Sequence, residues 1–143
     1  MKVIKLIIHH SLTKDGKVND WNAIRRYHVE VKKWAAIGYH YGIELVGDKY
    51  VIQKGRAEWR TGAHTKGQNA KSLGICVVGN YDLAEPPEAA LNLLANLCAK
   101  LCKKYNLKPD DIETHHKYAS YKTCPGKLFP MDKLWAKVRE IGV

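Results

Sequence analysis

The chain has 143 residues, of which 45% are hydrophobic and 27% charged, a composition that excludes a disordered chain. This length fits one domain and is short for two, so we expect a single domain over residues 1–143. The 24 lysines and arginines outnumber the 14 acidic residues and give a net charge of +10. Such a charge favours acidic partners, such as nucleic acid, anionic lipid or an acidic cell-wall polymer, without identifying a function.

The first segment, "KVIKLIIH", is apolar and β-branched and predicts a buried strand that ends at His9. Its apolar run is too short for a signal peptide, Lys5 interrupts it, and no cleavage site of small residues follows. We therefore expect synthesis in the cytoplasm without a signal peptide. No segment reaches the roughly 18 apolar residues of a membrane span, so we expect none.

The next stretch, "HSLTKDGKVN" at residues 10–19, predicts a polar loop. From Asp20, a good N-cap residue, apolar side chains recur at helical spacing and predict an amphipathic helix over residues 20–36. "AIGYHYGIELVGDKYVIQKG" predicts two strands joined as a hairpin at Gly47-Asp48. The following "AEWRTGAHTKGQNAKS" has little periodicity and is long for a connection, which is typical of functional loops.

The second half of the sequence also alternates predicted strands and helices. "LGICVVGNY" predicts a buried strand, and Pro86-Pro87 opens a helix that runs to about Tyr105. "DDIETH" predicts a short strand, and "MDKLWAKVREI" a closing helix. Interspersed strands and helices predict an α/β fold in which helices flank one central mixed β-sheet.

Residues 115–126, "HHKYASYKTCPG", bring two histidines and a cysteine close to a Pro-Gly turn. This pattern fits a metal site, a thiol assisted by histidines, or a polar loop. Zinc takes imidazole nitrogen and thiolate sulfur, so Cys124 and either His115 or His116 could supply two ligands. A third ligand must then come from elsewhere, and His9, at the end of the first strand, is the natural candidate.

The other histidines and cysteines have simpler interpretations. His10 should face away from His9, because successive strand residues point to opposite faces of a sheet. His28 lies on the apolar side of a predicted helix and is expected in the core. The remaining cysteines fall on apolar faces with no C-x-x-C pair, so we expect reduced, buried thiols at Cys76, Cys98 and Cys102.

Four segments, "IIHHS", "GYHYGIEL", "GAHTKGQNAKSLGICVVGNY" and "THHKYASYKTCPG", together resemble the type 2 N-acetylmuramoyl-L-alanine amidases. That family includes the peptidoglycan recognition proteins and the phage lysozymes, and the likeness, closest to the phage lysozymes, spans residues 3–135. It implies the mixed-sheet fold of that family and one Zn²⁺ per chain. It also implies hydrolysis of the amide between N-acetylmuramic acid and L-alanine in peptidoglycan by a zinc-activated water.

The family pattern, transferred position by position, implies roles for eight residues. The implied zinc ligands are His9, His115 and Cys124; His115 fits better than His116, although this loop carries one extra residue. Tyr39 and Lys122 take the catalytic positions of the phage lysozyme branch. Cys76 stands where other branches have a glutamate, which favours the tyrosine and lysine. The implied substrate-binding residues are His64, Lys66 and Asn69.

The resemblance makes peptidoglycan the expected partner of a monomer that acts on the cell wall after release, with a phage or prophage origin. Two alternatives remain: a non-catalytic peptidoglycan-binding module, and a basic regulator that binds nucleic acid or a polymerase. The basic residues are scattered and no aromatic recognition motif is interleaved with them, so no specific nucleic acid is expected.

Overall fold

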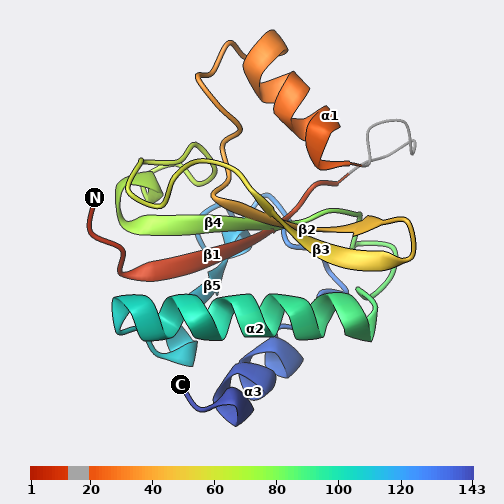
Figure 1. Cartoon of the computed structure of the whole chain (residues 1–143), viewed down its shortest axis with the longest axis vertical. Coiled ribbons are helices and arrows are strands. Elements are labelled where there is room, and N and C mark those ends of the chain that lie inside the picture. The colour runs from red at the N-terminus through yellow and green to blue at the C-terminus, as the bar shows by residue number, and fades with distance from the viewer. Residues whose placement is uncertain (13–19) are drawn as a thin grey trace.

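The computed structural model describes residues 1–12 and 20–143, so most of the loop expected at residues 10–19 lies outside the described residues. A five-stranded sheet in the order β3-β2-β4-β1-β5 forms the middle layer (Figure 1). Its strands are β1 (Lys5–His10), β2 (Tyr41–Val46), β3 (Lys49–Lys54), β4 (Ser72–Val77) and β5 (Ile112–Thr114). Neighbouring strands are parallel except β2 and β3, which pair antiparallel. The sheet is therefore mixed, as the sequence predicts.

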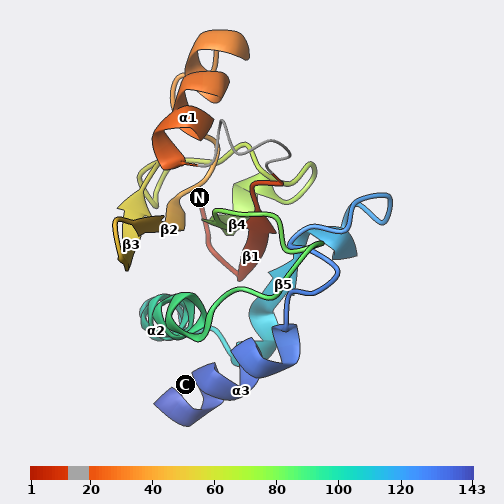
Figure 2. The ribbon, with the colours of Figure 1, turned by 90° about the vertical axis from the view of Figure 1, so that its right-hand side faces the viewer.

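Helices cover both faces of this sheet and make three layers. The long helix α2 (Glu88–Tyr105) and the closing helix α3 (Met131–Ile141) lie on one face, and α1 (Trp21–Arg26) lies on the other (Figure 2). Short helical turns occupy Tyr27–Val31, Asn69–Lys71, Pro109–Asp111 and His115–Lys117. The α/β architecture with a flanked central sheet is confirmed.

The main core lies between the sheet and α2. The apolar face of α2 is buried, including Leu94 and both cysteines, Cys98 and Cys102, which are fully inaccessible. These side chains pack against strand residues such as Leu6 and Ile75. Each fully buried aliphatic side chain stabilises the fold by about 1.5–3 kcal/mol, so this layer holds the sheet in place.

The alternation of β1 separates the two adjacent histidines. Leu6 and Ile8 belong to the core under α2, and His10 points the same way, where its Nδ1 accepts a hydrogen bond from the Tyr81 backbone N–H at 3.1 Å. His9 points to the opposite face, where its ring lies 5.1 Å from that of Tyr39. The prediction that one strand would divide these histidines is confirmed.

The first helix ends earlier than its apolar spacing predicts. The α-helical part stops at Arg26, one π-helical turn follows, and Lys33 has a positive φ of 61°. The predicted apolar face also fails beyond this point, because Val31 is 65% exposed. His28 is only half-buried, and its Nδ1 accepts a hydrogen bond from the Gly38 N–H at 3.0 Å. This contact turns the chain back towards Tyr39, so tertiary contacts override the helical period.

The predicted hairpin is present, with Gly47 in the left-handed region at φ 64°. The long segment that follows β3 is tied to the rest of the protein through Glu58. Its carboxylate accepts hydrogen bonds from Tyr41, Tyr105 and Lys104, and so joins this segment to α2. The segment therefore has a defined course despite its lack of regular structure.

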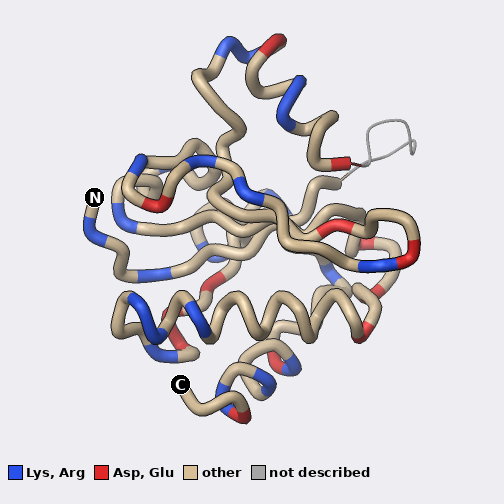
Figure 3. The backbone as a smooth tube through the Cα atoms, viewed as in Figure 1, with Lys and Arg blue, Asp and Glu red and all other residues tan. Residues whose placement is uncertain are grey.

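Lysine and arginine residues are spread over strands, loops and helices rather than gathered along one element (Figure 3). Within residues 1–12 and 20–143, no helix combines the length and apolar character needed to cross a membrane.

Candidate metal centre

Two parallel strands bring His9 and His115 to the same edge of the sheet. β1 pairs with β5 so that Ile8 lies opposite Thr114, and each histidine is the next residue of its chain segment. Their ring centroids are 4.6 Å apart. His9 and His115 are 106 residues apart in the sequence, and the register between β1 and β5 brings them together.

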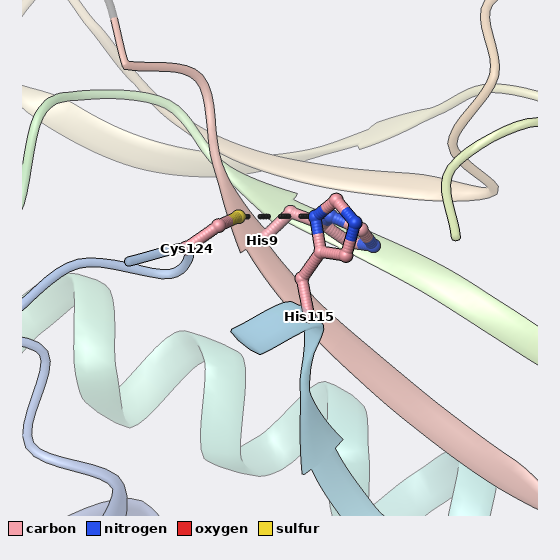
Figure 4. Close-up of side chains that lie close together, drawn as sticks. All are labelled: His9, His115 and Cys124. Atoms are coloured by element: carbon pink, nitrogen blue, oxygen red, sulfur yellow. Dashed lines mark hydrogen bonds between the residues drawn. The ribbon is translucent and has the colours of Figure 1, made fainter. Parts of the chain in front are cut away.

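Cys124 completes the group from the loop that follows. One possible ligand atom from each of His9, His115 and Cys124 lies within 4.8 Å of the others (Figure 4). The Cys124 Sγ lies 3.7 Å from His9 Nδ1, and the residue is buried. The structure thus brings together the three ligands that the family pattern implies.

The neighbouring histidine does not join this group. His116 is exposed, and its Nδ1 donates to the backbone carbonyl of Lys122. Its backbone N–H donates to the carbonyl of Cys124 at 2.9 Å. His116 therefore fastens the two ends of the loop, while the short helical turn after β5 directs His115 towards His9.

A carboxylate anchors the cysteine loop on the other side. Asp82 accepts a hydrogen bond from Thr123 Oγ1 at 2.9 Å and another from the Lys127 backbone N–H at 2.8 Å. Gly126 packs directly on the backbone of Tyr81, where a Cβ would lie 2.5 Å from the Tyr81 carbonyl carbon. The Cys124–Pro125 peptide bond within this loop is cis. Contacts on both sides of Cys124 therefore fix its position.

A cavity of about 390 Å³ opens beside the three candidate ligands. Tyr39 and Lys122, to which the family resemblance assigns catalytic roles, both line it. Two exposed side chains border it as well, Leu12 and Tyr121, the latter 85% exposed. The Lys122 Nζ lies 5.9 Å from the centre of the Tyr121 ring. A molecule of moderate size could therefore meet the ligands, the phenol and the ammonium group together.

The three residues expected to bind substrate lie elsewhere. His64 does not line this cavity, because its ring lies behind His9 with centroids 5.0 Å apart. The Asn69 side-chain oxygen accepts hydrogen bonds from the backbone N–H groups of His64 and Thr65, each at 2.9 Å. Lys66 is exposed on the same loop. The motif that the sequence marks as functional is thus built around His64 rather than around the cavity.

His40 and Cys76 lie near this region but have structural partners. His40 donates through Nε2 to the carbonyl of Arg60 at 2.7 Å, and its Nδ1 accepts from the Gly74 N–H at 3.1 Å. The Cys76 thiol is fully buried beneath Tyr39, and burial raises its pKa well above the usual value. Cys76 therefore offers no base at the position where the family resemblance implies a glutamate in other branches.

Burial sets the protonation of the ligand group. It lowers the pKa of His9 well below its usual value, and together with the charge of Lys122 it lowers the pKa of His115 to about 4. Both imidazoles are therefore neutral at neutral pH and have a lone pair to offer. Burial also raises the pKa of the Cys124 thiol to about 12, although the His10 N–H and Lys122 oppose this.

The donor set fits a zinc ion. Two neutral imidazoles and one thiol are the ligand types that Zn²⁺ prefers, and three protein ligands leave a fourth position open. A cation beside a buried thiol of high pKa stabilises its thiolate, and metal binding would provide that cation. Tyr39 lines the cavity, and burial raises the pKa of its hydroxyl well above the usual value, so it keeps its proton.

Comparisons with known proteins agree on one family. The family model described as N-acetylmuramoyl-L-alanine amidase matches residues 1–127. The endolysin of Escherichia phage T7 is 32% identical over 137 residues, which cover 92% of this chain and 85% of that protein. An N-acetylmuramoyl-L-alanine amidase of Mus musculus is 31% identical over 145 residues. The match covers 95% of this chain but 27% of the mouse protein, so the chain spans about a quarter of that relative.

A solved structure shows the same fold. The N-acetylmuramoyl-L-alanine amidase LysC from Clostridium intestinale URNW superposes with a TM-score of 0.82 at 28% identity. The superposition covers 96% of this chain and 86% of LysC.

Proposed function

The chain belongs to the N-acetylmuramoyl-L-alanine amidase family, and we propose that it hydrolyses the amide bond between N-acetylmuramic acid and the L-alanine of the peptidoglycan stem peptide. The single observation that carries this proposal is the group of His9, His115 and Cys124 beside an open cavity. A module that only binds peptidoglycan has no need of a buried donor set for a metal.

The three residues would hold one Zn²⁺ per chain. When bound, zinc supplies a Lewis acid that lowers the pKa of water towards about 7 and polarises a carbonyl oxygen. The chain itself supplies the shape of the site. His9 is rigid because it belongs to a central strand, and Cys124 is held by the contacts of its loop with Asp82 and His10.

Lys122 and Tyr39 would act on the reacting amide. Lys122 stands at the cavity wall two residues before Cys124, where its ammonium group can donate to the oxyanion formed on the scissile carbonyl. One such donor typically accelerates acyl transfer by about 10²- to 10³-fold. Tyr39 lines the same cavity, with its ring 5.1 Å from that of His9, and its neutral hydroxyl would orient the attacking water through a hydrogen bond.

The remaining expectations follow from this reaction. The substrate is peptidoglycan, an acidic polymer whose carboxylates would be attracted by the net charge of +10. We propose that the protein acts on the cell wall as a monomer, without binding a specific nucleic acid. The similarity to phage T7 endolysin supports a phage or prophage origin and release from the cytoplasm before action.

The experiment is turnover of purified peptidoglycan by the zinc-loaded protein. We expect new free amino groups on alanine, in step with solubilisation of the wall, and none with Cys124→Ala. New reducing sugar ends without free alanine amino groups would instead identify a glycosidase. Binding to peptidoglycan with no new end group of either kind would identify a recognition module.

A further inference from the structure

The second ring nitrogen of His9 has its own set of partners. Nδ1 of His9 faces Cys124, whereas Nε2 lies 3.0 Å from Nδ1 of His64 and 3.3 Å from Oγ1 of Thr65. Oγ1 of Thr65 in turn lies 3.0 Å from His64 Nδ1. Thr65 is only 2% exposed and His9 only 1%, so the Thr65 hydroxyl and the His9 ring are closed off from solvent.

The glycine-rich loop holds His64 in this position by close packing. A Cβ on Gly74 would lie 2.5 Å from Cγ of His64, and a Cβ on Gly62 would lie 2.7 Å from its Cδ2. The imidazole therefore lies flat against β4 only because both positions are glycine. Asn69 fixes the backbone by accepting from the N–H groups of His64 and Thr65. Four positions of the motif "GAHTKGQNAKSLG", namely Gly62, Thr65, Asn69 and Gly74, thus serve the placement of one ring.

The chemistry of a metal-bound imidazole explains what this ring can do. A neutral histidine has one lone pair and one N–H, so a His9 that offers Nδ1 to a metal must carry its proton on Nε2. That N–H is buried and needs an acceptor. The acceptors within reach of this N–H are His64 Nδ1 and the Thr65 hydroxyl oxygen. Where His64 Nδ1 is the acceptor, His64 carries its own proton on Nε2, a buried atom with no hydrogen-bond partner among the described residues.

We propose that His64 is a positioning residue whose Nδ1 accepts the proton of His9 Nε2 and so fixes His9 in the tautomer that presents Nδ1 to the metal. This inference rests on the proposed function, because it assigns a task within the same site. Metal-bound histidines commonly donate to a carboxylate or a carbonyl. Here the acceptor is a neutral imidazole, which orients His9 without adding negative charge to the donor set.

This assignment differs from a contact with substrate, which the family resemblance suggests for His64. The ring is absent from the cavity wall and lies behind His9, so a substrate in the cavity would meet His9, Tyr39 and Lys122 first. A substrate contact would change KM and leave metal binding unchanged. A positioning contact changes metal binding even when no substrate is present.

The test uses two substitutions of similar size. His64→Gln keeps an acceptor oxygen, whereas His64→Leu fills the space without one. Zinc affinity is measured by competition with a chelator, and the tautomer of His9 by long-range ¹H–¹⁵N correlation spectra of the zinc-free protein. We expect His64→Leu to weaken zinc binding about 10- to 100-fold and to lose the single Nε2–H tautomer of His9. His64→Gln should restore both, and Thr65→Val should resemble the wild type.

Other results would overturn the inference. Wild-type zinc affinity together with an unchanged His9 tautomer in His64→Leu would show that the acceptor is not needed. Equal losses in the Gln and Leu variants would reduce the role of His64 to packing. A loss in Thr65→Val but not in His64→Leu would make the hydroxyl the acceptor. A wild-type protein that binds zinc but does not cleave peptidoglycan would contradict the amidase proposal alone, because neither readout depends on turnover.

Discussion

The backbone N–H of His10 donates a hydrogen bond to the Sγ of Cys124 at 3.3 Å, in a buried setting. β1 therefore contributes twice to the candidate site, because it presents the His9 ring and also directs a backbone N–H at the sulfur of Cys124. A hydrogen bond of this kind favours the thiolate, the form in which cysteine binds a metal.

We expect zinc binding to distinguish the adjacent histidines. His115→Ala and Cys124→Ala should each lose stoichiometric zinc, because each removes a ligand from a three-ligand site. His116→Ala should retain it, because that side chain is exposed and its Nδ1 donates to the Lys122 carbonyl, away from the candidate ligands. Metal content after dialysis, measured by atomic emission, checks this. Loss of zinc from His116→Ala with retention in His115→Ala would reverse the assignment.

Lys122→Ala should separate catalysis from metal binding. We expect full zinc content and a kcat about 10²- to 10³-fold lower, with little change in KM, because the ammonium group is proposed to act on the transition state. Lys127→Ala is a matched control, since this exposed lysine lies in the same loop but does not line the cavity. A comparable drop in both variants would mean that the loop charge as a whole matters, and not Lys122.

Asp82→Ala should weaken the site from a distance. The carboxylate holds Thr123 and Lys127 on either side of Cys124, so its removal should free this loop. We expect a loss of about 1 kcal/mol in stability and weaker zinc binding, measured by denaturant unfolding and chelator competition. Glu85→Ala is the control, because Glu85 is exposed and contacts Lys133 outside the loop. Unchanged zinc affinity in Asp82→Ala would show that the remaining loop contacts suffice.

Glu58 should make stability depend on pH. Burial alone would raise its pKa, but hydrogen bonds from Lys104, Tyr105 and Tyr41 outweigh burial and lower the pKa from 4.5 to about 2. Its contribution is therefore complete above pH 4.5 and is lost as the pH falls towards 2. Glu58→Gln should cost about 1–2 kcal/mol at pH 7, and this difference should shrink steadily below pH 4.5 in denaturant titrations. A difference that is independent of pH would contradict this origin.

The elements with strong local signals were predictable from the sequence. Alternation along β1 separates His9 from His10, and the helical spacing of apolar residues places Cys98 and Cys102 under α2. Both patterns depend on neighbours within a few residues. The early end of α1 was not predictable, because it depends on a hydrogen bond between His28 and Gly38, which is a contact of the folded chain.

The candidate site likewise combines features that the sequence predicts with features that depend on contacts in the folded chain. Spacing indicates that His115, His116 and Cys124 belong to one loop but leaves open which ring turns inward, since that depends on the helical turn after β5. The sequence indicates that the block around His64 is functional, but it does not reveal that His64 contacts His9. Only the pairing of β1 with β4 brings the loop before Gly74 against His9, which lies 55 residues away.

The candidate metal ligands come from opposite ends of the described chain, and this affects how the protein can be synthesised and divided into fragments. No nascent chain can close the metal group before Cys124 has left the ribosome, so zinc cannot rescue a truncated product that contains only β1 to α2. A cut in the connection between β4 and α2 would leave His9 on one fragment and the other two ligands on the second. Because metal binding contributes directly to folding, zinc would then join the two halves, and reassembly of the fragments should depend on the ion.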